Sequence, residues 1–205
     1  QLNPTVTALQ KRITKMENGI SSVAFSTGMA AISSTMLSLL KAGDHVIASS
    51  FLFGNTNSFF GTLNRLGIEV SLVDATKAQL VENSIKQNTK IVFVETIANP
   101  VTQVADLALI GRICKNENLV YIVDNTMTSP YLFQPRDVGA SLIINSLTKY
   151  IGGHGNALGG VVTDAGNFDW KTYENIIETY RSEKPELWGL TQIKKKGLRD
   201  MGSSL

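Results

Sequence analysis

The sequence contains little of the two residue types that most often form cross-links and hold metals. Its 205 residues include one cysteine, Cys114, and two histidines. A single cysteine cannot form an internal disulfide and is typical of a reducing compartment, so we expect a cytoplasmic protein. A structural zinc site takes about four cysteine or histidine ligands, so we predict no metal centre.

An excess of charge and long apolar runs are also missing. The 19 basic and 17 acidic residues give a net charge of +2. The one basic cluster, Lys194 to Lys196, is interpreted as a solvated face. No apolar run approaches the roughly 18 residues of a membrane span, and no charged-then-apolar signal segment opens the chain. We therefore expect neither a nucleic-acid partner nor a membrane partner.

The sequence does have short apolar runs that alternate with longer helix-like segments. Hydrophobic residues make up 43% of the chain, which suits one sizeable core. Apolar, β-branched runs predict seven strands, at 21–27, 45–50, 69–74, 90–96, 119–125, 141–146 and 159–164. Segments between the earlier runs predict helices at 29–40, 55–66, 76–87 and 107–116.

This order of elements predicts an α/β protein with three layers, α/β/α, around a mostly parallel seven-stranded sheet. Continuous apolar strands alternating with helices are typical of a parallel sheet that is covered on both faces. A glycine-rich loop, and no full helix, joins the last two strand candidates. We therefore expect the sheet to be mixed at one edge.

Ligands of open α/β sheets bind beyond the carboxyl ends of the strands, where three polar motifs of this sequence lie. In STGMA (26–30) a strand runs into a helix through Gly28, and free N–H groups at a helix start suit phosphate. The alternative is a plain strand-to-helix turn. In VDNT (123–126) Asp124 ends the most apolar strand, where its charge needs a cationic partner. The alternative is a cap or turn aspartate.

The third motif is SLTK (146–149), in which Lys149 follows two hydroxyl residues and precedes a run of glycines. A lysine bonds covalently to a carbonyl carbon when a dry, cationic neighbourhood lowers its pKa. The alternative is a lysine that only lines a loop. The chain has no G-x-G-x-x-G and no G-x-x-x-x-G-K-[ST] motif, so dinucleotides and nucleoside triphosphates are poor candidates.

Together the three motifs match the needs of pyridoxal 5'-phosphate better than any one does alone. That cofactor takes an anion site for its phosphate, a carboxylate for its ring nitrogen and a lysine for its aldehyde. The carboxylate keeps the ring protonated and so controls how well the ring withdraws electrons. We therefore predict pyridoxal phosphate as the cofactor.

Six motifs in chain order also resemble those of the pyridoxal-phosphate-dependent enzymes of cysteine and methionine metabolism. The motifs are NPT (3–5), SSVAFSTGMAAI (21–32), LFGNT (52–56), ETIANP (95–100), VDNT (123–126) and NSLTKYIGGHG (145–155). The family includes cystathionine synthases and lyases, methionine γ-lyase and homoserine-ester sulfhydrylases. The resemblance implies the aspartate-aminotransferase-like (fold type I) large domain. Residues 1–205 would form this cofactor-binding domain, incomplete at the N-terminus and without the C-terminal small domain.

The resemblance also implies the catalytic residues. Lys149 would hold the cofactor covalently and, once released by the substrate, act as the general base at Cα. Asp124 would pair with the ring nitrogen. His154, among the glycines beyond Lys149, is expected to have a structural hydrogen-bonding role and no part in proton transfer.

The same resemblance implies the residues that bind the cofactor. The backbone amides of Gly28 and Met29 and the hydroxyls of Ser146 and Thr148 would bind its phosphate. Asn99 of ETIANP would contact the phenolic oxygen of the cofactor and the carboxylate of the substrate.

Phe53 is a departure from the family pattern, which usually has a tyrosine stacked on the cofactor ring. Phenylalanine keeps the stacking but has no O–H to donate. An ester leaving group departs as a stable carboxylate and needs little protonation, unlike a thiolate. The substitution therefore favours a transferase similar to O-acetylhomoserine sulfhydrylase.

Such an enzyme converts O-acetylhomoserine or O-succinylhomoserine, with sulfide or a thiol, to homocysteine or methionine. Three alternatives stay open: a γ-lyase of methionine or cystathionine, a cystathionine γ-synthase, and a catalytically silent protein with the same fold. Family members lend residues to each other's active sites. The resemblance thus implies a homotetramer, a dimer of dimers, with an amino-acid substrate and a sulfur donor as its small-molecule partners.

Overall fold

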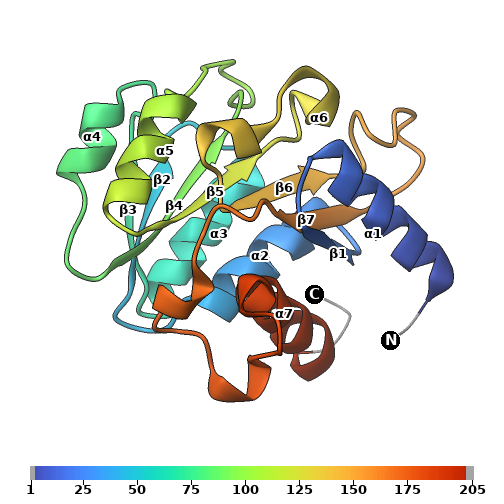
Figure 1. Ribbon diagram of the computed structural model, residues 1–205. Helices are drawn as coiled ribbons and strands as arrows, with labels where there is room; N and C mark the ends of the chain where they lie inside the picture. The colour runs from blue at the N-terminus through green and yellow to red at the C-terminus, as the bar shows by residue number, and fades with distance from the viewer. Residues whose placement is uncertain (1–2, 202–205) are drawn as a thin grey trace.

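A seven-stranded sheet forms the centre of the computed structural model, which describes residues 3–201 (Figure 1). The spatial order of the strands is β1-β7-β6-β5-β4-β2-β3. Their bounds are β1 Ser21–Phe25, β2 His45–Ser49, β3 Glu69–Val73, β4 Thr89–Glu95, β5 Val120–Asp124, β6 Leu142–Ser146 and β7 Gly160–Asp164. All seven predicted strands are present.

The direction of the strands confirms the predicted mixed edge. Strands β2 to β6 pair in parallel with their neighbours within this group. Strand β7 is antiparallel both to β6 and to β1. No helix lies between β6 and β7, so the chain turns back directly through the glycine-rich loop and reverses its direction.

Helices cover both faces of the sheet, which confirms the three-layer α/β/α prediction (Figure 1). One apolar core packs α2, α3 and α7 on one face, and a second core packs α4 and α5 on the other. The bounds are α1 Pro4–Met16, α2 Gly28–Leu39, α3 Gly54–Arg65, α4 Ala78–Asn83, α5 Leu107–Asn116, α6 Ser129–Leu132 and α7 Trp188–Lys194.

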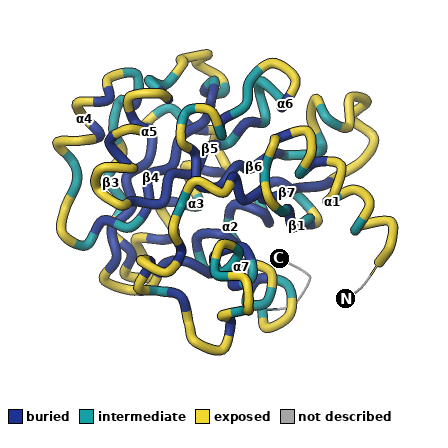
Figure 2. The backbone as a smooth tube through the Cα atoms, viewed as in Figure 1, coloured by how far each residue is buried: buried dark blue, intermediate teal, exposed yellow. Residues whose placement is uncertain are grey.

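Alternate residues of each central strand point into the two cores. In β5, Val120 and Ile122 lie in the core with α2 and α3, and Tyr121 and Val123 lie in the core with α5. The tube in Figure 2 is accordingly buried along the central strands and exposed along much of the outer helices. Because both faces are covered, these strands are continuous apolar runs in the sequence.

Helix α1 was not among the predicted helices, although its start has a local signal. The side chain of Asn3 caps the helix by accepting the N–H of Thr5 over 3.0 Å, and Pro4 is its first residue. An Asn-Pro pair in these positions favours a helix start. Helix α1 packs over β1 and β7 through buried Ile13.

One helix prediction needs correction, and one further helix was not predicted. The predicted helix 76–87 is shortened to α4, because the Asp74 carboxylate accepts the N–H of Thr76 over 3.0 Å in a turn. At its other end, Thr89 Oγ1 accepts the N–H of Lys86 over 2.7 Å just as β4 begins. Helix α7 was not predicted; it buries Ile193 against α2 and leaves Lys194 exposed, as expected for a solvated face.

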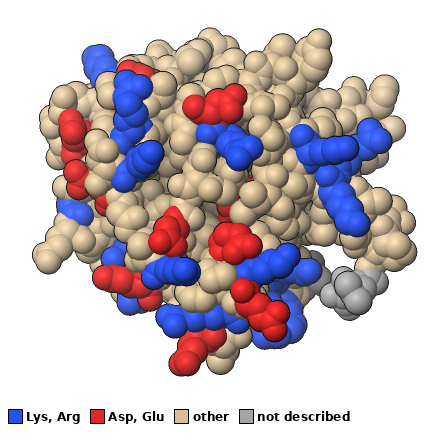
Figure 3. Space-filling view, viewed as in Figure 1, with Lys and Arg blue, Asp and Glu red and all other residues tan. Residues whose placement is uncertain are grey.

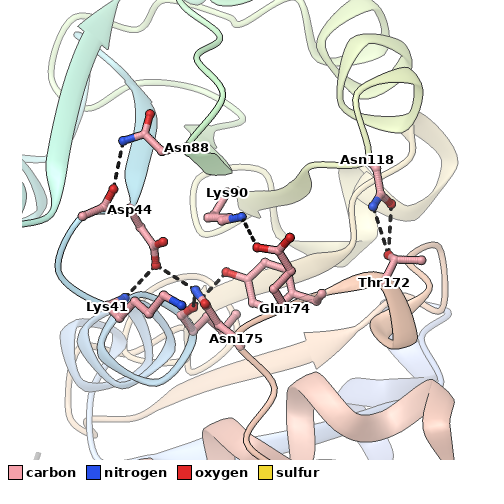
Figure 4. A network of polar contacts seen from close by, with 11 residues as sticks. Lys41, Asp44, Asn88, Lys90, Asn118, Thr172, Glu174 and Asn175 are labelled. Atoms are coloured by element: carbon pink, nitrogen blue, oxygen red, sulfur yellow. Dashed lines mark hydrogen bonds and ion pairs between the residues drawn. The ribbon is translucent and has the colours of Figure 1, made fainter.

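Polar contacts tie the segment 172–175 to the amino ends of the strands (Figure 4). Asn175 Nδ2 donates to Oδ2 of Asp44, the residue immediately before β2, over 2.7 Å. Lys90 Nζ, near the start of β4, pairs with Glu174 Oε2 at 2.8 Å. These contacts stabilise the edge of the sheet opposite the carboxyl ends.

The surface carries mixed charge. Figure 3 shows basic and acidic side chains interspersed on the viewed face, and α1 exposes Lys11, Arg12 and Lys15. None of the helices within residues 3–201 is both long and apolar enough to cross a membrane. The same residues contain no group of three or more His, Cys, Asp or Glu side chains that could hold a metal ion.

Candidate active site

A cavity of about 670 Å³ lies at the carboxyl ends of β4, β5 and β6, beside the first turns of α2 and α3. Every residue that the sequence assigned to the site lines this cavity: Gly28, Met29, Phe53, Asn99, Asp124, Ser146, Thr148 and Lys149. The fold therefore brings together residues from five separate segments. Their individual roles remain predictions.

Asp124 ends β5 and turns its carboxylate into the cavity. Its Oδ1 accepts the N–H of Thr126 over 2.9 Å. Burial raises the pKa of this carboxyl, and the hydrogen bonds from Thr126 oppose the shift. No lysine or arginine within residues 3–201 forms an ion pair with Asp124. A half-buried carboxylate without a cationic partner within residues 3–201 suits a protonated ring nitrogen.

The start of α2 forms the second part of the site. Thr27 Oγ1 caps the helix by accepting the N–H of Ala30 over 3.0 Å. The N–H groups of Gly28 and Met29 have no acceptor within the helix, since a helix leaves its first donors unpaired. A Cβ atom at position 28 would lie 2.7 Å from Cβ of Ser146. Glycine thus allows the helix start to approach the end of β6, which fits an anion cradle.

Two hydroxyl residues follow at the end of β6. The N–H of Ser146 donates to Thr126 Oγ1 over 2.8 Å, which joins the ends of β5 and β6. The Thr148 hydroxyl accepts the N–H of Gly159 over 3.2 Å and donates to its carbonyl oxygen over 3.3 Å. Ser146 thus lies against the helix start, and Thr148 closes the base of the glycine-rich loop.

Lys149 lies in the turn that follows. Its N–H donates to the carbonyl oxygen of Ser146 over 3.2 Å, and the carbonyl oxygen of Lys149 accepts the N–H of Gly153 over 2.7 Å. Gly153 has a φ of 78°, a conformation that favours glycine. Lys149 is exposed and lines the cavity.

His154 does not have the expected structural role in the part of the chain that the structure describes. It is exposed in the glycine-rich loop, and its ring makes no hydrogen bond within residues 3–201. The glycines around it form the turn without help from the side chain.

Sequence reasoning missed Glu95, which lines the cavity beside Phe53 and Asn99. Its Oε1 accepts the N–H of Phe53 over 2.7 Å, and its Oε2 accepts the N–H of Asn99 over 3.3 Å. Phe53 stands at the start of α3 and is 40% exposed, so one face of its ring is open to a ligand. An acidic residue at the end of an apolar strand was the available signal, as it was for Asp124.

A buried polar cluster behind the strand ends was also missed. Glu17 Oε1 accepts Nδ2 of Asn125 over 3.0 Å and Nδ2 of Asn145 over 2.6 Å. These asparagines are the sequence neighbours of Asp124 and Ser146. Burial raises the pKa of the Glu17 carboxyl. The cluster joins the end of α1 to the ends of β5 and β6.

A mostly parallel seven-stranded sheet with helices on both faces is consistent with fold type I pyridoxal-phosphate enzymes. The sequence profile of the Cys/Met metabolism PLP-dependent enzymes matches residues 1–204. The chain belongs to this family, whose cofactor is pyridoxal phosphate.

Individual relatives differ in their reactions. The cystathionine γ-lyase of Bacillus subtilis is 43% identical over 80% of this chain and 43% of its own length. The solved O-acetylhomoserine sulfhydrylase of Wolinella succinogenes is 38% identical, with a TM-score of 0.90 over 99% of this chain and 57% of its own. A solved Campylobacter jejuni structure that contains N'-pyridoxyl-lysine-5'-monophosphate is 32% identical, with a TM-score of 0.87 over 99% of this chain and 54% of its own. The chain thus spans about half the length of these relatives.

Proposed function

We propose that the whole protein is an O-acetylhomoserine sulfhydrylase, which replaces the acetoxy group at Cγ with sulfide or a thiol. The products are homocysteine or methionine, and acetate. One observation carries the proposal: Asp124, Lys149 and Phe53 line a single cavity. The first two residues suit the family's cofactor, and the third bears on the choice of leaving group.

The residues around the cavity have separate tasks in this proposal. Pyridoxal phosphate, when bound, supplies an electron sink for the charge that develops at Cα of the substrate. The Asp124 carboxylate holds the proton on the ring nitrogen. The Lys149 amine bonds to the aldehyde and, once displaced by the substrate, takes the proton from Cα.

Phosphate binding is assigned to the edge formed by α2 and β6. The N–H groups of Gly28 and Met29 and the Ser146 hydroxyl would donate to the phosphate oxygens, and the Thr148 hydroxyl would join them by turning away from the carbonyl oxygen of Gly159. The close approach of Gly28 to Ser146 supports this assignment. Asn99 would contact the phenolic oxygen and the substrate carboxylate.

Phe53 favours replacement of a good leaving group. Its ring can stack on the cofactor but cannot protonate a departing thiolate. Acetate leaves as a carboxylate of low proton affinity and needs no such donor. The Wolinella relative, an O-acetylhomoserine sulfhydrylase, supports the same choice.

A γ-lyase is the second candidate function, because the Bacillus relative at 43% identity is a cystathionine γ-lyase. Such an enzyme would expel a thiol or thiolate and release an α-keto acid and ammonia. The phenyl ring at position 53 argues against efficient departure of that group.

We also propose a cytoplasmic homotetramer in which this chain is the large domain and a small domain completes each subunit. The partial coverage of the relatives supports the missing domain. Large apolar side chains exposed at the carboxyl edge support subunit contacts: Tyr131, Leu132, Tyr150 and Leu158 are 92%, 73%, 62% and 76% exposed. Sedimentation of the whole protein measures the assembly.

A direct assay separates the two candidate reactions. The whole protein is supplied with O-acetylhomoserine or O-succinylhomoserine plus sulfide, and homocysteine is quantified. In parallel it is supplied with methionine or cystathionine, and ammonia is quantified. We expect rapid formation of homocysteine and little ammonia. Methionine breakdown as fast as acetylhomoserine consumption would favour the lyase.

A further inference from the structure

Glu95 occupies a position equivalent to that of Asp124 on the neighbouring strand. The two residues end β4 and β5 and are paired in register. Because their strands are parallel, the two side chains point to the same face of the sheet, and both line the cavity. The site therefore contains two neighbouring carboxyl groups, of which the assigned roles use one.

Among residues 3–201, the Glu95 carboxyl is engaged by main-chain donors only. One oxygen accepts the N–H of Phe53 at 2.7 Å and the other that of Asn99 at 3.3 Å. Phe53 comes 42 residues earlier in the sequence and opens α3, whereas Asn99 lies in the loop that leaves β4. The carboxyl group thus connects two segments whose side chains both line the cavity.

The chain retains this group at an electrostatic cost. Glu95 is 7% exposed and forms no ion pair with a lysine or arginine within residues 3–201. The pKa of Glu95 is raised to about 7, mainly by burial and to a smaller extent by the neighbouring Asp124 carboxylate. An apolar side chain here would avoid that cost but would leave two N–H groups without acceptors.

We propose that Glu95 is a positioning residue, which holds the Phe53 ring and the Asn99 amide in place around a shared ligand by binding the backbone of both. The proposal rests on the proposed cofactor site, in which Phe53 stacks on the ring and Asn99 contacts its phenolic oxygen. Glu95 itself takes no proton from the substrate.

Amide hydrogen exchange tests the contact in the whole protein without cofactor. Glu95→Gln has almost the same shape but only one strong acceptor oxygen. We expect exchange at Phe53 or Asn99 to accelerate about fivefold or more, since the variant loses a strong acceptor oxygen at one of the two amides. The control is Glu117→Gln, the same change at an exposed position outside the cavity lining, which should leave both amides within about twofold of wild type.

A second measurement connects the contact to the ligand. We expect Glu95→Gln to weaken pyridoxal phosphate binding about tenfold and to alter the visible circular dichroism of the bound cofactor. Glu95→Asp keeps two acceptor oxygens on a shorter side chain and should restore part of both signals.

The outcomes separate this proposal from the proposed reaction. Unchanged exchange at both amides in Glu95→Gln would overturn the proposal, and so would equal acceleration throughout the protein. Acceleration at the two amides with unchanged cofactor binding and dichroism would also overturn it. If wild-type protein fails to convert acetylhomoserine, the proposed reaction fails, but the exchange result stands.

Discussion

Asn145 and Glu17 are joined by a hydrogen bond of 2.6 Å between Nδ2 and Oε1, across 128 positions of the chain. The same oxygen accepts Nδ2 of Asn125 over 3.0 Å. Glu17 ends α1, and the asparagines adjoin Asp124 and Ser146 on β5 and β6. One buried carboxyl therefore fixes two strand ends that carry predicted site residues.

Removal of the Glu17 carboxyl should destabilise the fold. In Glu17→Ala the Asn145 amide loses the acceptor oxygen of Glu17, and each buried donor left unpaired costs about 1–3 kcal/mol. Asn125 Nδ2 keeps a second acceptor, the carbonyl oxygen of Phe133 at 2.9 Å. Urea denaturation should show this loss in free energy of unfolding.

Two matched variants make the Glu17 prediction specific. Glu17→Gln keeps an acceptor oxygen and should cost less than Glu17→Ala. Glu117 ends α5 as Glu17 ends α1, but it is exposed, so Glu117→Ala should change the free energy of unfolding by less than about 0.5 kcal/mol. Equal effects at the two positions would contradict the role of the buried cluster.

Asp124→Ala should separate cofactor binding from turnover. The phosphate site is untouched, so we expect part of the cofactor binding to remain. Loss of the carboxylate that stabilises the protonated ring should lower turnover several hundredfold or more. This magnitude follows from the roughly 3–5 kcal/mol that breaking a buried charge pair costs. Steady-state kinetics of the cofactor-saturated protein measures this loss.

Asp74 offers a matched control for Asp124. It follows β3 and accepts the N–H of Thr76, as Asp124 accepts that of Thr126, but it does not line the cavity. Asp74→Ala should keep near-normal turnover. Near-normal turnover in Asp124→Ala would mean that Asp124 is only a turn residue.

Phe53→Tyr should raise elimination from methionine. The added hydroxyl can donate a proton to a departing thiolate, whereas replacement of acetate gains nothing from it. Ammonia release from methionine and homocysteine formation from O-acetylhomoserine are measured side by side. Phe51, two residues earlier and outside the cavity lining, provides the control Phe51→Tyr. No change in the ratio of the two activities would remove Phe53 as the determinant of reaction type.

Asp164 should make stability depend on pH. It is fully buried at the end of β7, where Trp170 Nε1 donates to Oδ2 over 2.8 Å and Gly166 N–H donates to Oδ1 over 2.8 Å. Burial raises its pKa to about 7 from the ordinary value near 3.8. The folded state therefore retains a proton that the unfolded state releases, so this contribution to stability is lost as pH rises from about 4 to about 7.

The Asp164→Asn variant isolates that contribution from the other acids, including Glu95, whose pKa is raised to about 7. Wild-type stability relative to the variant should fall by up to about 1.4 kcal/mol per pH unit within the window. Urea denaturation at several pH values measures it. A difference that stays constant from pH 4 to 7 would show that Asp164 ionises normally in the folded protein.

Local patterns were sufficient to predict the sheet. Continuous apolar, β-branched runs mark strands buried on both faces, and the glycine-rich loop after Lys149 marked the antiparallel edge. The start of α1 also has a local sequence signal, because Asn3 and Pro4 form its cap, but the prediction did not include this helix. The shortened α4 depended on a turn made by Asp74 and Thr76.

The supporting residues of the site could not be read in the same way. Glu95 binds the N–H of Phe53, and any residue except proline offers that donor, so no side-chain pattern marks the pair. Glu17 meets Asn125 and Asn145 only after α1 has packed on the sheet. Residues that contact a ligand collect in motifs, whereas the residues that hold them are scattered along the chain.

The most direct test of the account is the position of the covalent bond between protein and cofactor. The whole protein is loaded with pyridoxal phosphate, reduced with borohydride, digested and mapped by mass spectrometry, with Lys149→Ala treated in parallel. The account predicts a pyridoxyl group on Lys149 and none on the corresponding peptide of the variant. A pyridoxyl group on another lysine of the wild-type protein, with Lys149 unmodified, would contradict it.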